Sequence, residues 1–277
     1  MLTKNIRFNN FSLKYSNKKI LSSFKKLIKE ENEIIESLKN TYKDSYSKKT
    51  INKLKKYTQV ILIGIGGSIL GSRSIYSFLK YRIKKNFVFK DSFEFSKKNS
   101  DNKKNKLNLI ISKSGNTLET IANSNILINK SKKNVFITEN KKSYLSDLAQ
   151  KLKFEVIHHN NFIGGRFSVL SEVGMLPAQL MGLNEKKFRR FNSLVQNKKF
   201  VKSLVQNVSN TLYLTKKKKF NSIILNYDDA SSDLFYWYQQ LIAESLGKKS
   251  KGILPVISNM PKDNHSLMQL YLSGFKN

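Results

Sequence analysis

Apolar runs alternate with amphipathic stretches along most of the chain, and this alternation predicts an α/β protein. Short runs of Val, Ile and Leu, typical of buried strands, are followed by a polar or glycine-rich loop and then by apolar residues at helical spacing. Strands and helices that alternate in this way build βαβ units with parallel sheets. In chain order the first set is a strand and tight loop within 60–71, a helix over 74–81, a strand over 107–112, a helix over 117–129, a strand over 134–138 and a helix over 141–152.

A second set of elements follows further along, with a strand over 222–227 and a helix over 231–246. Between the two sets, residues 184–200 are rich in lysine and poor in apolar side chains, which predicts a seam. Near the N-terminus, residues 20–39 place apolar side chains at helical spacing, which predicts one amphipathic helix. We therefore expect an N-terminal helical extension (1–50), a first domain (51–184), and a seam with a partial second domain (185–277).

The charge balance is unusual for a globular protein of 277 residues. The chain has 51 Lys and Arg against 19 Asp and Glu, a net charge of +32, and its pI is near 10.1. Such a balance raises nucleic acid or an anionic membrane as partners. The lysines are spread along the chain among frequent Asn and Ile, however, and the longest pure run, 216–219, has four members. We attribute the charge to a compositional bias and expect no nucleic acid and no membrane as partner.

Other classes are disfavoured by residues that the chain lacks. Cysteine is absent, which excludes disulfides, thiolate nucleophiles and Cys-ligated metals. The three histidines, His158, His159 and His265, show no metal-ligand spacing, so we expect no metal site. The N-terminus lacks the apolar core of a signal peptide, and no apolar run approaches the roughly 18 residues that span a membrane. We expect a cytoplasmic protein.

The glycine-rich stretch 64–71 is the first candidate for ligand binding. Ile69 stands where a dinucleotide fingerprint needs its third glycine, and the residues after Gly71 are not the Lys-Ser/Thr pair of a P-loop. What remains is a tight turn between strand and helix, where backbone amides and the Ser68 hydroxyl can approach an anion. Taken alone, the stretch is as compatible with a structural turn that binds no ligand as with an anion-binding turn.

A second loop, 112–117, occupies the same strand-to-helix position in the next unit. Its hydroxyls and one ammonium group form a good phosphate cup. Helix capping accounts for one polar side chain, that of Asn116 or Thr117 at the helix start, but not for all of them. Two neighbouring anion-binding loops on one sheet edge favour a phosphorylated small molecule over capping. The side chains of this cup are Ser112, Lys113, Ser114 and Thr117.

Five segments follow one another along the chain: GIGGSILG, SKSGNTLET, GGRFSVLSEVGMLPA, QQLIAESLGK and DNHSLMQLYLSG. In this order they resemble the signature stretches of the glucose-6-phosphate isomerase family, whose members have two sugar isomerase domains. The resemblance runs from about residue 57 to the last residue and implies two α/β lobes with parallel sheets flanked by helices, the second incomplete. It implies an aldose–ketose isomerase that interconverts glucose 6-phosphate and fructose 6-phosphate through a cis-enediol, without cofactor or metal.

The resemblance also implies a role for each matching residue. Glu244 would be the base that moves a proton between carbons, and Arg166 the cation beside the enediolate oxygen. Gln240, one helical turn before Glu244, would contact the substrate. The remaining substrate-binding residues would be Gly67, Ser68, Ser112, Lys113, Ser114 and Thr117.

His265 would open the sugar ring, and in the family this histidine reaches into the neighbouring subunit's site. A homodimer with shared active sites follows from that implication. Each catalytic candidate has a plain alternative: Glu244 as a solvated helix charge, Arg166 as a turn residue and His265 as a surface histidine. His158 and His159 are expected at a strand end with no assigned role.

The chain departs from the family pattern in two places. Asn264 stands where a glutamine commonly precedes the histidine, and Asn277 is the last residue, whereas family members continue well beyond. The further part contains a helix with a lysine and a glutamine that line the site. We expect a fragment of a longer product, with an unpaired sheet edge and uncovered apolar surface; the alternative is a remainder supplied by another chain.

Two other functions compete with an isomerase. A sugar-phosphate-binding module would keep the phosphate anchor without turnover. A nucleic-acid binder, suggested by the charge alone, would bind with a steep dependence on salt.

Overall fold

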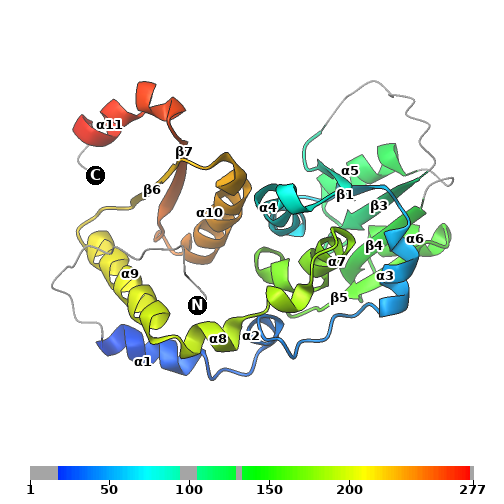
Figure 1. The fold of residues 1–277 in the computed structure, drawn as a ribbon, viewed down its shortest axis with the longest axis horizontal. Helices are drawn as coiled ribbons and strands as arrows, with labels where there is room; N and C mark the ends of the chain where they lie inside the picture. Colours follow the sequence, from blue (N-terminus) through cyan, green and yellow to red (C-terminus); the bar gives the residue numbers. More distant parts are fainter. Residues whose placement is uncertain (1–17, 94–104, 129–132, 275–277) are drawn as a thin grey trace.

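The computed structural model describes residues 18–93, 105–128 and 133–274, which form two α/β lobes (Figure 1). In the first lobe, five parallel strands form a sheet in the order β2-β1-β3-β4-β5. In the second lobe the described residues form one pair of parallel strands, β6 and β7. The strands are β1 (Gln59–Ile63), β2 (Asn86–Lys90), β3 (Lys106–Ile111), β4 (Lys133–Glu139), β5 (Glu155–His159), β6 (Asn221–Asn226) and β7 (Leu254–Asn259).

Helices connect the strands and cover both faces of the first sheet. The longest described helix, α9, packs against α1, and α10 lies between β6 and β7 in sequence. The α-helices are α1 (Lys18–Leu27), α2 (Glu33–Ser37), α3 (Lys48–Lys55), α4 (Leu70–Phe78), α5 (Leu118–Leu127), α6 (Tyr144–Lys151), α7 (Glu172–Leu180), α8 (Phe191–Gln196), α9 (Lys198–Lys216), α10 (Ser232–Leu246) and α11 (Met268–Ser273). The 3₁₀ turns are η1 (Gly66–Ser68), η2 (Lys80–Arg82), η3 (Gly165–Leu170), η4 (Glu185–Lys187), η5 (Asp229–Ser231) and η6 (Lys262–His265).

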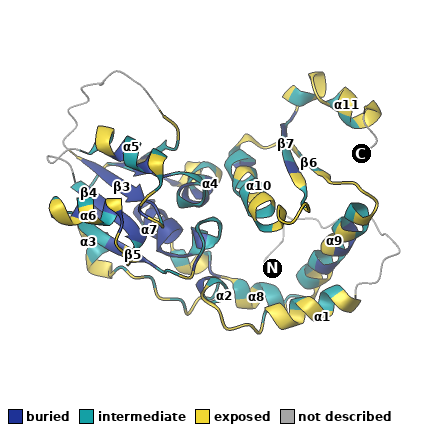
Figure 2. Ribbon diagram, turned by 180° about the vertical axis from the view of Figure 1, so that it is seen from behind, coloured by how far each residue is buried: buried dark blue, intermediate teal, exposed yellow. Residues whose placement is uncertain are grey.

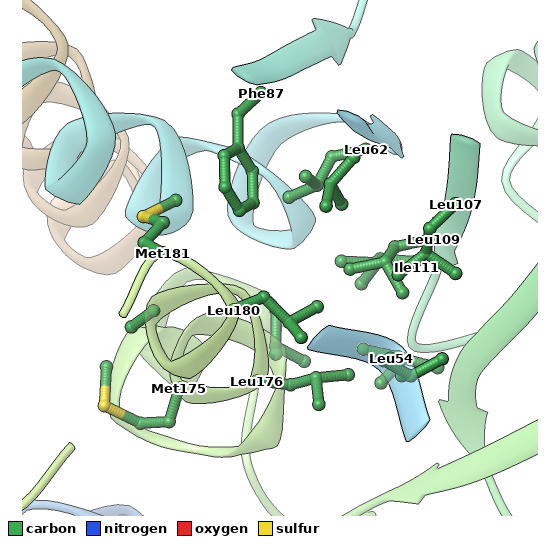
Figure 3. Packing of buried hydrophobic residues seen from close by; sticks show 14 of the residues in the cluster. Leu54, Leu62, Phe87, Leu107, Leu109, Ile111, Met175, Leu176, Leu180 and Met181 are labelled. Atoms are coloured by element: carbon green, nitrogen blue, oxygen red, sulfur yellow. The ribbon is translucent and has the colours of Figure 1, made fainter. Parts of the chain in front are cut away.

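Alternation of side chains along each strand gives the first sheet two apolar faces. On one face Leu62 and Leu109 pack with α3, α4 and α7 (Figure 3), and on the other Ile63 and Ile110 pack with α5 and α6. Every residue of β3 is buried, as expected for the central strand of a sheet covered on both sides. This rigid core fixes the strand ends, where the loops of the candidate site begin.

The predicted α/β architecture with two lobes and parallel sheets is confirmed. The predicted strands within 60–71 and over 107–112, 134–138 and 222–227 correspond to β1, β3, β4 and β6, and the predicted helices over 74–81, 117–129, 141–152 and 231–246 to α4, α5, α6 and α10. Residue 129 lies outside the described residues. Helix α6 begins at Tyr144 because Ser143 and Ser146 form a reciprocal capping box.

The single helix predicted over 20–39 is wrong, because the structure divides this segment into α1 and α2. The break lies between Leu27 and Glu33. The Asn32 side chain accepts a hydrogen bond from the Ile35 amide at 2.9 Å and so begins a new helix. The apolar residues keep helical spacing on both sides of Asn32, so the sequence pattern does not indicate this cap.

The predicted seam, 184–200, contains η4, α8 and the first residues of α9. Arg189 within it is buried and forms an ion pair with Asp44 at 2.6 Å, so this segment is tied to the N-terminal extension. Residues 1–17 of that extension lie outside the described residues. The domain boundaries themselves stay a prediction.

The second lobe is less buried than the first, as Figure 2 shows for α10, α11 and β6. Neither α10 nor α11 contains a fully buried residue, and Ile223 and Leu225 on β6 are 39% and 46% exposed. Apolar side chains at such exposure fit the uncovered surface that the sequence predicts for this lobe.

Candidate active site

Two loops meet at the carboxyl ends of β1 and β3. Turn η1 follows β1, and residues 112–117 join β3 to α5. Because β1 and β3 pair in parallel, their loops emerge at the same edge of the sheet. The two candidate anion loops therefore lie side by side.

The second loop presents hydroxyl groups that helix capping does not use. Thr117 stands at the N-cap of α5, but its side chain makes no capping hydrogen bond among the described residues. Its Oγ1 instead lies 2.9 Å from Oγ of Ser112, which accepts the Gly115 amide at 3.2 Å. Gly115 has φ +64°, and a Cβ there would lie 2.1 Å from Ser143 Oγ, so only glycine fits this turn.

Gly67 brings the first loop into direct contact with the segment that contains Arg166. A Cβ at Gly67 would lie 2.2 Å from the carbonyl carbon of Gly165 and 2.5 Å from the Arg166 amide nitrogen. The Ser168 hydroxyl joins the same contact, donating to the carbonyl oxygens of Gly165 and Gly67 at 2.7 and 3.2 Å. Turns η1 and η3 thus pack backbone to backbone, and glycine at position 67 makes this approach possible.

Replacement of Gly67 by alanine is expected to destabilise the protein by about 1–3 kcal/mol, because the new methyl group overlaps backbone atoms that cannot rotate away. Urea unfolding of the full chain measures the change. Gly165→Ala is the matched control, since a Cβ at Gly165 meets no described atom within 4 Å. Equal stability of the two variants would contradict the close contact of η1 and η3.

Arg166 connects the first lobe to helix α10 through both its side chain and its backbone. Its guanidinium donates to Ser245 Oγ at 3.0 Å and to Glu244 Oε2 at 3.2 Å, and stacks over the Phe167 ring at 4.5 Å. Its carbonyl oxygen accepts the indole N–H of Trp237 at 3.1 Å. These contacts fix the guanidinium beside the carboxylate.

Gln240 and Glu244 lie one turn apart on α10 and are hydrogen bonded. Gln240 Nε2 donates to Glu244 Oε1 at 2.9 Å, so each carboxylate oxygen of Glu244 accepts one bond. The side chain of Glu244 remains 50% exposed. Oε1 of Gln240 is buried without a described partner, which leaves one acceptor available at this point.

The N-terminal end of α10 is fixed by Arg73 on α4. The Arg73 guanidinium lies 2.6 Å from Asp91 Oδ2 and 3.1 Å from Asp233 Oδ1, and Asp233 is in the first turn of α10. Ser74 Oγ donates to the Asp233 carbonyl at 2.7 Å, and Ser77 donates to the Asp233 carboxylate. Because α10 packs along α4, these contacts set the position of Gln240 and Glu244 relative to the first sheet (Figure 1).

An open pocket of about 420 Å³ lies where these segments meet. It contains eight of the ten site residues predicted from the sequence. Their cations, Lys113 and Arg166, face the same cavity as the Glu244 carboxylate, so the pocket can hold an anion next to a base. The eight are Gly67, Ser68, Lys113, Ser114, Thr117, Arg166, Gln240 and Glu244.

Two predicted site residues do not line this pocket. Ser112 is buried and lies behind Thr117 through their shared hydrogen bond. His265 lies in η6 after β7, is exposed, and is not among the residues around the pocket. The structure of one chain therefore leaves the predicted role of His265 untested.

Three polar residues of the pocket were missed by the sequence analysis: Glu139, Lys141 and Asn161. Glu139 is the last residue of β4, and Lys141 and Asn161 lie just after β4 and β5, at the same carboxyl edge as the two glycine-rich loops. Lys141 Nζ lies 3.7 Å from Glu139 Oε2, and Asn161 accepts the amide of Asn140 at 3.3 Å. Their position after parallel strands was the available signal, but no local motif singles them out.

Comparison with known proteins identifies the family. The family model described as phosphoglucose isomerase matches residues 9–257. The chain belongs to the phosphoglucose isomerase family. A glucose-6-phosphate isomerase of Methanocaldococcus jannaschii is 38% identical over 240 residues, covering 80% of this chain and 59% of that protein. One from Campylobacter jejuni is 32% identical over 247 residues, covering 80% and 60%.

Solved structures agree on the fold of this family member. A glucose-6-phosphate isomerase from Chlamydia trachomatis superposes with a TM-score of 0.62 at 21% identity, over 96% of this chain and 54% of that chain. A hypothetical protein, TT0462, from Thermus thermophilus superposes with a TM-score of 0.72 at 22% identity, over 94% of this chain and 68% of that chain. The chain spans about three fifths of the length of the curated relatives that it matches.

The described residues contain neither a cluster of metal-ligand side chains nor a helix suited to a membrane. Within 18–93, 105–128 and 133–274, no three or more His, Asp or Glu side chains are grouped so that they could hold a metal ion. Over the same residues, no helix is both long and apolar enough to cross a membrane.

Proposed function

We propose that this family member is an aldose–ketose isomerase that interconverts glucose 6-phosphate and fructose 6-phosphate. One observation carries the proposal: a carboxylate, a guanidinium and a hydroxyl-rich loop converge on one pocket. The guanidinium of Arg166 lies 3.2 Å from Oε2 of Glu244. The loop residues Lys113, Ser114 and Thr117 line the same cavity. An enediol mechanism requires a carbon base, a cation for the enediolate oxygen and a phosphate anchor.

The phosphate anchor is assigned to the two loops at the ends of β1 and β3. Ser68, Ser114 and Thr117 offer hydroxyls to the phosphate oxygens, and Lys113 offers the charge. Ser112 supports Thr117 from behind at 2.9 Å. The backbone amides at the start of α5 add to the attraction for an anion.

The proton transfer is assigned to α10. Glu244 takes the proton from C2 of the open-chain aldose; the electron pair of the C2–H bond forms the C1–C2 double bond, and the π pair of the C1 carbonyl moves to O1, which takes up a proton. The proton held by Glu244 then goes to C1, while O2 gives up its proton and becomes the ketose carbonyl oxygen. Arg166 stabilises the negative charge that develops on the sugar oxygen. Gln240, whose side chain lines the pocket, contacts the substrate.

Ring opening is assigned to His265 of a second subunit, so we propose a homodimer with shared sites. The exposure of His265 outside its own chain's pocket supports this arrangement. A cytoplasmic location belongs to the proposal, because charged sugar phosphates do not cross membranes unaided. Nucleic acid is not proposed as a partner, since the pocket is suited to a small anion.

A sugar-phosphate-binding module without turnover is the second candidate. The position of His265 favours it, because the pocket of one chain then contains the phosphate anchor without an acid for the ring oxygen. The two candidates differ in turnover and agree on binding.

Conversion of fructose 6-phosphate to glucose 6-phosphate by the full chain tests the proposal. We expect glucose 6-phosphate to form with the wild-type chain and not with Glu244→Gln. Thermal stabilisation by fructose 6-phosphate without any conversion identifies the binding module instead. If neither stabilisation nor conversion occurs, both candidates are wrong.

Replacement of Lys113 by glutamine is expected to weaken fructose 6-phosphate binding by about 10–100-fold, because a charge-assisted hydrogen bond contributes about 1.5–3 kcal/mol. Calorimetric titration measures the dissociation constant. The control is Lys142→Gln, an exposed lysine outside the pocket, for which the affinity should not change. Equal losses in both variants would indicate general charge attraction instead of a phosphate anchor.

A further inference from the structure

A buried hydrogen-bonded pair, His159 and Glu172, joins the two ends of the loop that contains Arg166. His159 is the last residue of β5 and Glu172 the first of α7, and the 12 residues between them include the whole of η3. Nδ1 of His159 lies 2.5 Å from Oε1 of Glu172, and both side chains are only 1% exposed. The two ends of the loop that contains Arg166 are therefore joined to each other.

Both ring nitrogens of His159 face acceptors. Nδ1 meets the Glu172 carboxylate, and Nε2 lies 3.0 Å from the carbonyl oxygen of Ile163. One side chain thus joins the loop at Ile163, three residues before Arg166, to the start of α7.

Glu172 accepts two further hydrogen bonds, one from the loop itself and one from the N-terminal extension. Its Oε1 accepts the amide of Asn160 at 2.9 Å, and its Oε2 accepts the hydroxyl of Tyr42 at 3.3 Å. Burial raises the pKa of Glu172, but the contact with His159 and the backbone hydrogen bonds, among them the one from the Asn160 amide, together hold that pKa below its usual range. The carboxylate is therefore ionised in the folded protein, as the pairing requires.

The other charged groups near the pair have hydrogen-bond or ion-pair partners of their own. Glu33 on α2 accepts from the Asn160 side chain at 2.9 Å, and Arg189, whose guanidinium lies 5.0 Å from the centre of the Tyr42 ring, is paired with Asp44. The pair of His159 and Glu172, together with the bond from the Asn160 amide to Glu172, joins the two ends of the loop.

We propose that His159 and Glu172 are positioning residues for Arg166. By fixing both ends of the loop, they keep the Arg166 guanidinium beside Glu244 and its carbonyl beside Trp237. The role of Arg166 that this pair serves rests on the proposed function. The position of the loop does not, and it can be measured without turnover. Positioning of a catalytic group to within about 1 Å is worth about 100-fold in rate.

Trp237 provides a built-in probe, since it is the only tryptophan of the chain and its indole N–H bonds to the Arg166 carbonyl. The experiment compares its emission and its quenching by acrylamide in the full-length wild type, His159→Asn, Glu172→Gln and the double variant, with circular dichroism as a check of folding. His158→Asn is the matched control, because His158 is the exposed neighbour. We expect red-shifted emission and stronger quenching in folded variants of the pair and no change in the control.

Wild-type emission and quenching in any folded variant of the pair would overturn the inference. The double variant is included because a single change leaves a buried charge without its partner and can prevent folding. If none of the three variants folds, amide hydrogen exchange in the wild type tests whether the loop is closed. Slow exchange over 160–167 supports the closed loop, and exchange as fast as over 247–252 overturns it.

The kinetic measurement separates this inference from the proposed function. Where the wild type turns over, His159→Asn should lose about 100-fold in kcat with a nearly unchanged KM, because the phosphate anchor is intact. An inactive wild type whose variants still show the emission change contradicts only the proposed function. An active wild type whose variants keep both emission and kcat contradicts only the positioning role.

Discussion

Replacing Glu244 with glutamine is expected to lower the turnover of fructose 6-phosphate by about 10²–10⁴-fold, the usual contribution of a positioned general base. Glutamine retains the shape of the side chain and can still bond to Gln240 and Arg166, but it cannot take a proton from carbon. Binding should be nearly unchanged, because the phosphate anchor lies on other segments. The measurement is kcat at saturating substrate, with the dissociation constant from calorimetry.

The matched control for this prediction is Glu31→Gln, which removes an exposed carboxylate outside the pocket. The control should retain wild-type kcat. An active Glu244→Gln variant would remove Glu244 as the carbon base and leave its contact with Arg166 as a structural ion pair.

The change Arg166→Lys is expected to reduce kcat by about 10²–10³-fold, the usual cost of losing one donor to a developing oxyanion. Lysine retains the positive charge, but it cannot bond to Ser245 and Glu244 through separate nitrogens of one planar group. The loss should appear in kcat more than in KM, because the charge on the oxygen develops only during reaction.

Steady-state kinetics on Arg166→Lys and on the exposed control Arg82→Lys test this prediction. A rise in KM with unchanged kcat would instead mean that Arg166 binds the ground state, for example at the phosphate. Wild-type kinetics in both variants would exclude Arg166 from the reaction.

Much of the fold could be predicted because the first lobe follows local rules. The run LNLII over 107–111 is almost wholly apolar, and the structure places it in the central, fully buried strand. The glycine- and hydroxyl-rich stretches after it and after β1 could be placed at one edge, because parallel strands end at the same side of a sheet. Five of the eight predicted site residues in the pocket lie there for this reason: Gly67, Ser68, Lys113, Ser114 and Thr117.

The rest depends on contacts between distant residues, which no local pattern encodes. Arg73 reads as part of a glycine-rich turn and helix, yet it binds Asp233, 160 positions away, and fixes α10. His159 was expected at a strand end with no role, yet its partner is the buried Glu172. The break at Asn32 was missed because a capping side chain can interrupt an apolar spacing without changing it.

Proton exchange at carbon tests the central claim most directly, because it follows the chemistry of Glu244 without depending on the final sugar ratio. Glucose 6-phosphate is incubated with the full chain in heavy water, and the C2 proton is followed by nuclear magnetic resonance. Since Glu244 is half exposed, the proton that it takes exchanges with solvent, and the account predicts deuterium at C2 with the wild type but not with Glu244→Gln. Retention of the C2 proton with the wild type, or equal exchange in both proteins, would contradict it.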